Sequence, residues 1–409
     1  MGKPKIRFKG YNDEWEQRKL GDWGNFYYGR SCPKWSVTED ATIPCIRYGE
    51  LYTKFGAKID RVYSYTNMPP ENLRFSRGTE VLIPRVGEDP MDYNHCTWLS
   101  MQDVAIGEMI SVFNTDNNPL FTATMFNATL QNEFAMRVEG GSVTNLYFEK
   151  LKNIEVSFPS IPEQKKIAAY FENLDRLITL HQRKCDEMKT LKKYMLQKMF
   201  PQNGQKISEI RFEGFTDEWE QRKLGELGSL KNGMNFSKEA MGIGFPFVNL
   251  QNIFGNNVID VINLGKAMAS NSQLKDYNLL NGDVLFVRSS VKLEGVGEAA
   301  LVPQNLENTT YSGFIIRFRD EYGLDNNFKR FIFGIESVRN QIMAQATNSA
   351  NKNISQTVLE NLCLKIPNKS EQEKIGLYFS DLDNLITLHQ RKCDELKSIK
   401  KFMLQNMFI

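Results

Sequence analysis

DEWEQRKLG occupies residues 13–21 and occurs again at residues 217–225, and LITLHQRKCDE occupies residues 177–187 and again residues 385–395. The two pairs of copies are 204 and 208 residues apart. A short box, a long variable block and a helical segment therefore follow one another twice along the chain. Because solenoid and propeller units repeat every ~20–50 residues, this longer period indicates a duplicated domain with its connector. One chain then gains the pseudo-twofold symmetry that a homodimer obtains from two chains.

The two helical segments carry apolar or semi-apolar residues at alternating spacings of four and three. Three heptads of this kind predict a coiled-coil seam along each helix. The predicted seam residues are Ile167, Phe171, Leu174, Ile178, His181, Cys185 and Met188 in the first copy, and Ile375, Phe379, Leu382, Ile386, His389, Cys393 and Leu396 in the second. Acidic residues follow a proline or serine at each start, and lysines crowd each end, as helix termini favour. We expect about 37 residues in each helix, or a length of about 55 Å.

The two long blocks between these landmarks contain short runs of Phe, Tyr, Val and Ile that Gly, Asn and Pro interrupt. This pattern predicts compact α+β domains of roughly 135 residues. The blocks are distant copies, because residues 46–49 align with 248–251 and residues 81–85 align with 284–288. Apolar framework positions are retained while the polar positions between them differ. Such a contrast is expected of two readers of two different targets.

The order of these features predicts six segments. They are an N-terminal connector box (1–24), a first globular domain (25–158), a central long helix (159–200), a linker with the second connector box (201–228), a second globular domain (229–365) and a C-terminal long helix (366–409). The expected fold class is α+β, with two globular α/β domains in a pseudo-twofold arrangement, separated by two long antiparallel coiled-coil helices. Duplex DNA is also twofold symmetric, and half-sites about one turn (~34 Å) apart lie on one of its faces.

The composition is that of a soluble globular protein, with 41% hydrophobic and 24% charged residues. No apolar run approaches the length of a membrane span, and MGKPKIRFKG at the start lacks the apolar core of a signal peptide. We therefore expect a cytoplasmic protein. The six cysteines show no CxxC spacing, which favours buried, reduced thiols over disulfides or zinc ligands.

The formal net charge of +2 is small for a protein that binds duplex DNA unaided. Residues 25–158 contain 12 Lys and Arg against 16 Asp and Glu, and residues 229–365 contain 13 against 12. If these blocks contact DNA, they do so through local patches. Much of the phosphate binding must then come from partner subunits.

Three further motifs stand beside the DEWEQRKLG box. The first is the expected start of the first long helix, residues 159–167, which contains EQ at 163–164 and KI at 166–167. The second is SEQEKIG at residues 370–376, and the third is ATNSANKNIS at residues 346–355. With the duplication, these motifs make nearly the whole chain resemble the specificity subunit of a type I restriction-modification enzyme. One departure is VEGGSVTNLY at residues 138–147, where the second block has ATNSANKNIS. That difference argues against carrying DNA contacts from one block to the other residue by residue.

The resemblance implies a function and a set of partners. Each variable block would be a target recognition domain that reads one half of a split, asymmetric sequence in double-stranded DNA. The long helices would pack antiparallel as a spacer and would dock two modification subunits. Those adenine methyltransferase subunits would use S-adenosylmethionine, and two optional restriction-translocase subunits would use ATP and Mg. For this chain itself we expect no bound cofactor and no membrane partner, because its sequence shows neither a nucleotide-binding loop nor an apolar membrane span.

Direct readout in the major groove favours Arg or Lys on guanine and Asn or Gln on adenine. Polar residues at expected strand ends and in loops are therefore the candidate base contacts. They are Arg30, Lys34, Arg47, Tyr48 and Arg85 in the first block, and Asn235, Asn249, Gln251, Asn252, Arg288, Ser289, Lys292, Asn348, Asn351, Lys352 and Asn353 in the second. For each of them, a solvated loop position or a salt bridge is the competing interpretation.

Other chemistry finds little support in the sequence. His181 and His389 occupy equivalent seam positions, where core packing that sets the register is favoured over a metal site. His95 beside Cys96 has no recognisable partner in the sequence, which disfavours a catalytic dyad. The chain also lacks a GxxxxGK[ST] loop. A self-contained methyltransferase and a coiled-coil adaptor without a DNA role are the alternatives to a non-catalytic recognition subunit.

Overall fold

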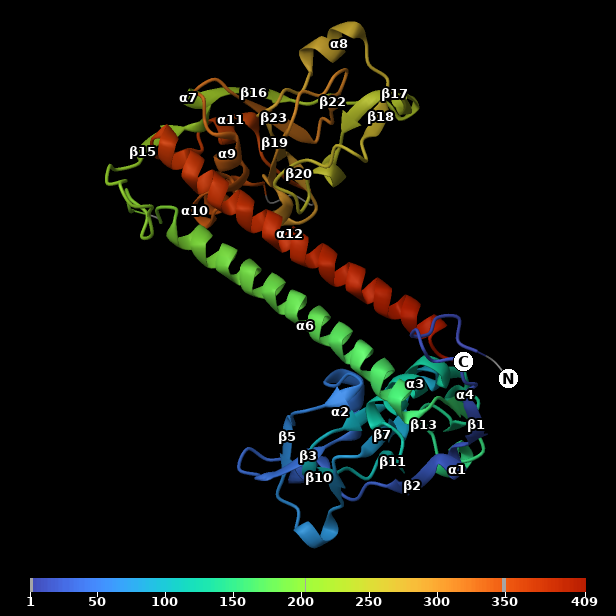
Figure 1. Cartoon of the computed structure of the whole chain (residues 1–409). Coiled ribbons are helices and arrows are strands. Elements are labelled where there is room, and N and C mark those ends of the chain that lie inside the picture. Colours follow the sequence, from blue (N-terminus) through green and yellow to red (C-terminus); the bar gives the residue numbers. More distant parts are fainter. Residues whose placement is uncertain (1–2, 203, 348–350) are drawn as a thin grey trace. The chain divides into compact units, whose positions relative to one another are not determined.

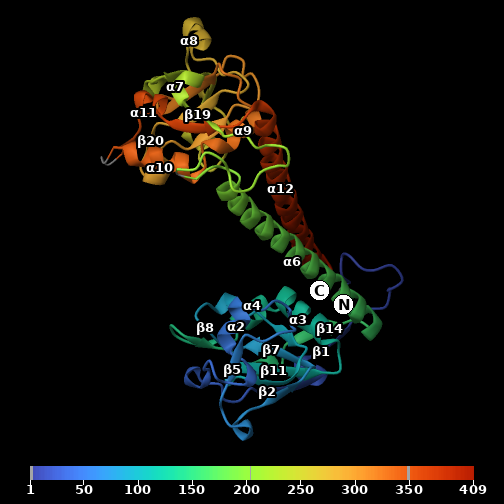
Figure 2. The same ribbon diagram turned by 90° about the vertical axis from the view of Figure 1, so that its left-hand side faces the viewer.

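The computed structural model describes residues 3–202, 204–347 and 351–409. It is a mixed α+β structure that divides into two compact units (Figures 1 and 2). The first unit comprises Met1–Gln182 with Arg391–Ile409, and the second comprises Arg183–Gln390. Each unit holds one globular domain together with parts of both long helices, α6 (Ile161–Lys198) and α12 (Lys369–Asn406). The fold class predicted from the sequence is confirmed, whereas the division into six segments stays a prediction.

The globular domain of the first unit is built on a five-stranded sheet in the order β2-β11-β7-β9-β4 and a four-stranded sheet in the order β5-β3-β10-β6. Its strands are β1 (Glu16–Lys19), β2 (Gly24–Tyr28), β3 (Ile43–Ile46), β4 (Lys58–Ile59), β5 (Ser64–Thr66), β6 (Phe75–Arg77), β7 (Glu80–Pro84), β8 (Val86–Gly87), β9 (Thr97–Leu99), β10 (Gln102–Ile106), β11 (Ile110–Thr115), β12 (Glu139–Gly140), β13 (Thr144–Asn145) and β14 (Glu155–Phe158). Its helices are α1 (Leu20–Trp23), α2 (Tyr48–Thr53), α3 (Pro119–Thr129), α4 (Gln131–Ala135) and α5 (Phe148–Leu151).

The second domain repeats this plan with a four-stranded sheet in the order β16-β23-β19-β21 and a three-stranded sheet in the order β18-β17-β22. Its strands are β15 (Glu220–Lys223), β16 (Gly228–Asn232), β17 (Met241–Val248), β18 (Gly265–Ala267), β19 (Val284–Val287), β20 (Ser289–Ser290), β21 (Ala299–Leu301), β22 (Thr310–Tyr311), β23 (Ile315–Asp320), β24 (Lys352–Asn353) and β25 (Cys363–Ile366). Its helices are α7 (Leu224–Leu227), α8 (Asn271–Asp276), α9 (Asn326–Ile332), α10 (Glu336–Gln345) and α11 (Gln356–Glu360).

The repeated box closes each domain. Its EQRK residues form β1, which pairs antiparallel with β14, and β15, which pairs antiparallel with β25. In both cases the partner strand directly precedes a long helix. The tryptophans of the box, Trp15 and Trp219, are 4% exposed and pack edge to face against Phe121 and Phe200. The box therefore ties the beginning of each domain to its end.

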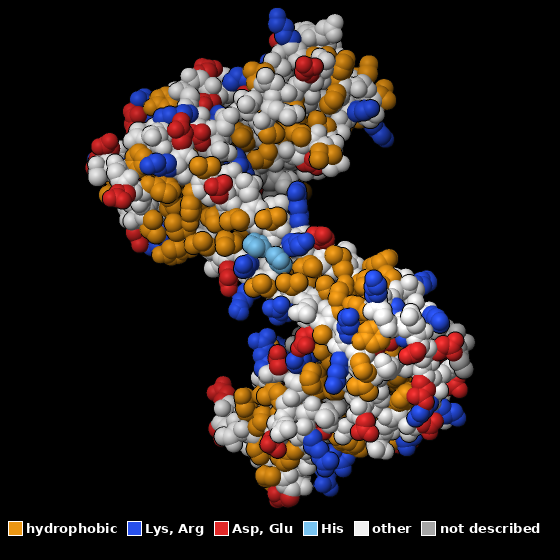
Figure 3. Space-filling model, viewed as in Figure 1, with side chains coloured by type: hydrophobic (Ala, Val, Ile, Leu, Met, Phe, Trp, Pro, Cys, Tyr) orange, Lys and Arg blue, Asp and Glu red, His pale blue; other side chains and the backbone are white. Residues whose placement is uncertain are grey.

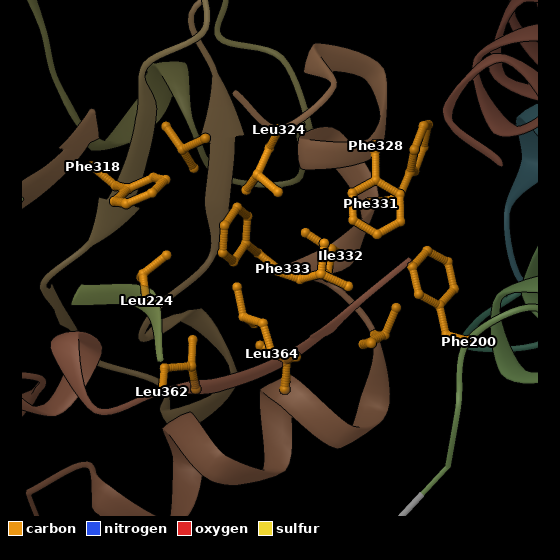
Figure 4. Packing of buried hydrophobic residues seen from close by; sticks show 14 of the residues in the cluster. Phe200, Leu224, Phe318, Leu324, Phe328, Phe331, Ile332, Phe333, Leu362 and Leu364 are labelled. Atoms are coloured by element: carbon orange, nitrogen blue, oxygen red, sulfur yellow. The ribbon is translucent and has the colours of Figure 1, made fainter. Parts of the chain in front are cut away.

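The core of the second unit lies between the β16-β23-β19-β21 sheet and the surrounding helices. Figure 4 shows Phe318 and Phe333 among the residues that approach it from the sheet and from the end of α9. Phe200, just after α6, stacks on Phe328 with ring centroids 5.7 Å apart. Burial of such large aromatic side chains supplies much of the stabilisation of a domain of this size.

Each long helix begins on a buried ion pair. The guanidinium of Arg7 donates to both carboxylate oxygens of Glu163 at 2.7 and 2.8 Å, and Arg211 donates to Glu371 at 2.7 Å twice. Both glutamates are fully buried. The adjacent Gln164 donates to the carbonyl oxygen of Pro159 at 2.9 Å, in the short connection between β14 and α6. These contacts give the EQ pair of each helix start a structural role.

The two helices run antiparallel where they meet within each unit. In the first unit, Lys400 of α12 donates to Asp175 of α6 at 2.5 Å. In the second unit, Lys192 of α6 donates to Asp383 of α12 at 2.5 Å. The residues of the predicted seam are all buried or half-buried. Ile167 also belongs to the globular core of the first unit, so the first turns of the helix pack against the domain.

The cysteines are free thiols, and all but one are buried. Cys363 is half-exposed, which corrects the expectation that every thiol is buried, because its strand β25 lies beside only β15 in a two-stranded sheet. Burial raises the pKa of the Cys96 thiol, so it stays protonated and unreactive. His95 does have a partner, since its Nε2 lies 3.1 Å from Asp92 Oδ1.

Candidate functional site

Three chain segments of the first domain meet at one turn, residues 106–110, which we call the first central turn. The amide of Arg30 donates to the carbonyl oxygen of Ile106 at 2.7 Å, and the amide of Arg85 donates to that of Met109 at 3.2 Å. The amide of Gly107 donates to the carbonyl oxygen of Ile46 at 3.0 Å, directly before Arg47. These bonds gather Arg30, Arg47 and Arg85 around the turn.

The second domain repeats this arrangement at residues 311–315, the second central turn. The amide of Met234 donates to the carbonyl oxygen of Tyr311 at 2.9 Å, and the amide of Arg288 donates to that of Phe314 at 2.7 Å. The amide of Ser312 donates to the carbonyl oxygen of Val248 at 2.9 Å. Hence Met234, Asn249 and Arg288 correspond to Arg30, Arg47 and Arg85, and the alignment expected from the sequence is confirmed.

Glycines allow the close approach of strands to both turns. A Cβ atom at Gly29 would overlap the carbonyl oxygen of Gly107, and one at Gly233 would overlap that of Ser312. Side chains at these positions would push β2 and β16 away from the turns. The glycines of YYGR (residues 27–30) and KNGM (residues 231–234) therefore allow the strands to contact the central turns.

The candidate residues of the first domain differ in their solvent exposure and in their side-chain contacts. Arg30 and Lys34 are exposed, Tyr48 is 39% exposed, and Arg47 is half-buried. The guanidinium of Arg85 lies over the rings of Tyr28 and Tyr147, with its carbon 4.7 and 5.4 Å from their centroids. Burial raises the pKa of Tyr28 to about 12, as does its hydrogen bond to Glu149, so this ring is neutral near pH 7.

In the second domain, Asn235 and Gln251 are exposed, while Asn252 is 1% exposed. The Asn252 side chain donates to the carbonyl oxygens of Asp260 and Asn263 at 3.2 and 3.1 Å and accepts from the amide of Asn249 at 3.0 Å. Asn252 therefore holds the loop that presents Asn249. That interior role differs from the base contact for which it was a candidate.

A short ladder brings the remaining candidates of the second domain together. Ser289 in β20 pairs with Asn353 in β24, and Ser290 pairs with Lys352. The amide of Ile354 donates to the carbonyl oxygen of Arg288 at 3.0 Å. Asn351 is exposed beside this ladder, and Asn348 lies outside the described residues. Arg288, Ser289, Lys352 and Asn353 thus share one place in the domain.

The first domain builds the same ladder from its divergent segment. Thr144 and Asn145 of β13 pair with Gly87 and Val86 of β8, and the amide of Leu146 donates to the carbonyl oxygen of Arg85 at 2.8 Å. The backbone is therefore shared although VEGGSVTNLY and ATNSANKNIS differ. Sequence reasoning missed Thr144 and Asn145 as members of the site, because only their pairing with β8 places them there.

Next to the second ladder, Ser289, Lys292, Asn351 and neighbouring side chains line a groove of about 560 Å³. On the face shown in Figure 3, Lys and Arg are interspersed with Asp and Glu over each unit, in line with the low net charge. Among the described residues, no cluster of His, Cys, Asp or Glu is fit to hold a metal ion. In the same part of the chain, no helix is long and apolar enough to cross a membrane.

Comparison with known proteins decides the family. The model of the type I restriction modification DNA specificity domain matches residues 97–190 and 216–398, more than half of the chain. The chain belongs to this family. The matched ranges of this specificity protein include every described candidate residue of the second domain. Arg30, Arg47 and Arg85 of the first domain precede them. The resemblance inferred from the sequence is confirmed.

Relatives of this specificity protein share its sequence at low identity. It is 24% identical over 251 residues to the type I restriction enzyme EcoKI specificity subunit of Escherichia coli, covering 60% of this chain and 54% of the relative. It is 22% identical over 284 residues to the MjaVIII specificity subunit of Methanocaldococcus jannaschii, covering 65% and 64%. The matches thus span about half to two thirds of these relatives.

The fold also has a counterpart among solved structures. The crystal structure of a type I restriction-modification S subunit from M. genitalium superposes with a TM-score of 0.63 at 14% identity. The superposition covers 100% of this chain and 99% of that one. At this low identity the likeness shows a shared fold, and the shared fold covers the whole chain.

Proposed function

We propose that each globular domain of this specificity subunit reads one half of a bipartite, asymmetric DNA target. The observation that carries the proposal is the equivalence of the two central turns, which present different side chains from one backbone arrangement. Arg47 and Asn249 are the clearest pair, because arginine suits guanine and asparagine suits adenine in the major groove. One scaffold with two sets of polar residues fits two different half-sites.

We further propose that the long helices dock two adenine methyltransferase subunits. Three pairs of equivalent positions on α6 and α12 carry exposed apolar side chains. They are Leu180 and Leu388, Leu191 and Ile399, and Tyr194 and Phe402. Because the same apolar surface occurs twice, it fits two copies of one partner, and the paired helices would fix the gap between the half-sites.

Catalysis in this proposal belongs to the partner subunits. The methyltransferase subunits would bind S-adenosylmethionine, and optional restriction subunits would bind ATP and Mg, while this chain recognises DNA in the cytoplasm without catalysing a reaction. The low net charge supports a shared DNA interface, since partners would supply further phosphate contacts. Titration of the isolated chain with S-adenosylmethionine tests this division, because tight binding would favour a self-contained methyltransferase.

A domain exchange tests the recognition role. Residues 25–158 are replaced by the corresponding block of another family member, and methylated sites are mapped in cells that carry the partner subunits. We expect one half-site to change while the gap and the other half-site stay. The reciprocal exchange of residues 229–365 should change the other half-site. Unchanged sites in both exchanges would favour a structural adaptor.

A further inference from the structure

The groove of the second domain has an unusually apolar rim. Phe254, Val291 and Phe314 line it, and these side chains are 38%, 78% and 58% exposed. Leu250 also lines it and is half-buried. Single exposed apolar residues are ordinary on a protein surface, but several around one groove indicate a binding site.

This apolar rim belongs to the same surface as the polar candidates. Phe314 is part of the second central turn, where its carbonyl oxygen accepts from the amide of Arg288. Val291 directly follows β20, and Ser289, Lys292 and Asn351 line the same groove. A ligand read by those polar residues would also meet Phe314 and Val291.

The first domain places different residues at the corresponding positions. The counterparts are Tyr52 for Phe254, Glu88 for Val291 and Met109 for Phe314. Tyr52 donates to the carbonyl oxygen of Val86 at 3.1 Å and covers β8, and Glu88 is exposed and acidic. The two domains therefore differ most at Val291, where the first domain has the charged Glu88, while Met109 keeps an apolar side chain in place of Phe314.

The chemistry of duplex DNA identifies the occupant. In the major groove, the 5-methyl group of thymine is the apolar feature on the base edges. Among the charged residues that line the groove, Glu294 and Glu298 outnumber Lys292, and this excess of carboxylates disfavours a phosphate there. We propose that Phe314 and Val291 contact a thymine methyl group, so that the second domain reads at least one A·T pair by apolar contact. This inference rests on the proposed function.

Removal of that methyl group alone tests the inference. The chain is assembled with its methyltransferase subunits, and its affinity is measured for a duplex carrying the mapped target. Each thymine of the half-site assigned to the second domain is then replaced by uracil, which lacks the methyl group. We expect about fourfold weaker binding for the contacted thymine, as burial of one such group supplies. The same replacement in the other half-site is the reference.

Variants show whether the rim is responsible. Two variants are compared, Phe314→Ala and Val291→Glu, and the second introduces the acidic residue found at the corresponding position of the first domain. In both variants, thymine and uracil duplexes should bind equally. Met241→Ala is the matched control, because Met241 is 42% exposed but does not line the groove, and it should keep the fourfold difference. Unchanged assembly with the methyltransferase subunits and an unchanged thermal unfolding temperature would show that the variants remain folded.

Two results would overturn the inference. They are equal binding of thymine and uracil duplexes by the unaltered complex, or an equal uracil effect in Phe314→Ala. Failure of the proposed function has a different signature. In that case, exchange of residues 229–365 would leave both methylated half-sites unchanged.

Discussion

Arg47 and Asn249 occupy the same backbone position in the two domains. The amide of Arg47 donates to Glu50 Oε2 at 2.8 Å, and the amide of Asn249 donates to Asn252 Oδ1 at 3.0 Å. In each domain the residue three positions later thus caps a short helical turn and fixes where the side chain of Arg47 or Asn249 leaves the backbone. The two positions are matched in geometry and differ in hydrogen-bonding capacity.

Arg47→Ala should weaken binding of the target by about 1–3 kcal/mol and relax one position of one half-site. The expected loss is that of the bidentate contact to guanine which we propose for Arg47. Competition binding with single-base variants of the target measures both effects. Asn249→Ala is the matched change and should relax the other half-site. A loss that is uniform across all sequences would instead mark Arg47 as a phosphate contact.

Asn252→Ala should lower the stability of the second domain by about 1–3 kcal/mol, because it leaves the amide of Asn249 and the carbonyl oxygens of Asp260 and Asn263 without their partner. Gln251→Ala, one residue away and exposed, should change stability by less than about 0.5 kcal/mol. Denaturant unfolding of the full chain compares the two variants. Equal stabilities would contradict the interior role of Asn252.

Glu371→Gln should destabilise the second unit by about 3–5 kcal/mol, because it leaves the mostly buried guanidinium of Arg211 without a charged partner. Glu163→Gln should do the same in the first unit through Arg7. A double replacement, Arg211→Met with Glu371→Leu, should recover much of the loss, since it removes both charges. Thermal unfolding of the three variants distinguishes a buried ion pair from a surface contact of little consequence.

Adding about one helical turn, four residues, after Glu187 and again after Glu395 should lengthen the gap between the half-sites and leave their sequences unchanged. Both insertions are needed, because the helices are paired antiparallel within each unit through Lys400 and Lys192. Methylation mapping in cells reports the gap directly. An unchanged gap in the double insertion would refute the helical spacer.

A thiol reagent should react with Cys363 well before the other cysteines of the native chain, because Cys363 is half-exposed and the others are buried. Cys363→Ser should abolish the fast phase. Cys96 should react only on unfolding, since burial both shields its thiol and raises its pKa. A fast phase that persists in Cys363→Ser would show that a buried thiol becomes accessible in the native protein.

The long helices were predictable from the sequence because their period and capping residues are local signals. The alignment of Arg85 with Arg288 was also predictable, since the apolar strands before them resemble each other. The central turns were not, because hydrogen bonds between segments far apart in sequence create them, such as that from Arg30 to Ile106. The sequence also could not show that Gln251 is exposed and Asn252 is buried, because the two adjacent side chains carry the same amide group and only the fold decides which one faces the interior.

The pairing of β1 with β14, and of β15 with β25, makes the chain enter and leave each globular domain at neighbouring strands. The two ends of a replaced domain would therefore lie on paired strands, directly before the helix that follows. The repeated box also supplies the same joining sequence before each domain, so a segment spliced in at that point keeps its frame and its anchoring tryptophan. Under the proposed function, this architecture would favour evolution by exchange of whole domains, in which a cell would acquire a new target half while the partner proteins stayed as they are.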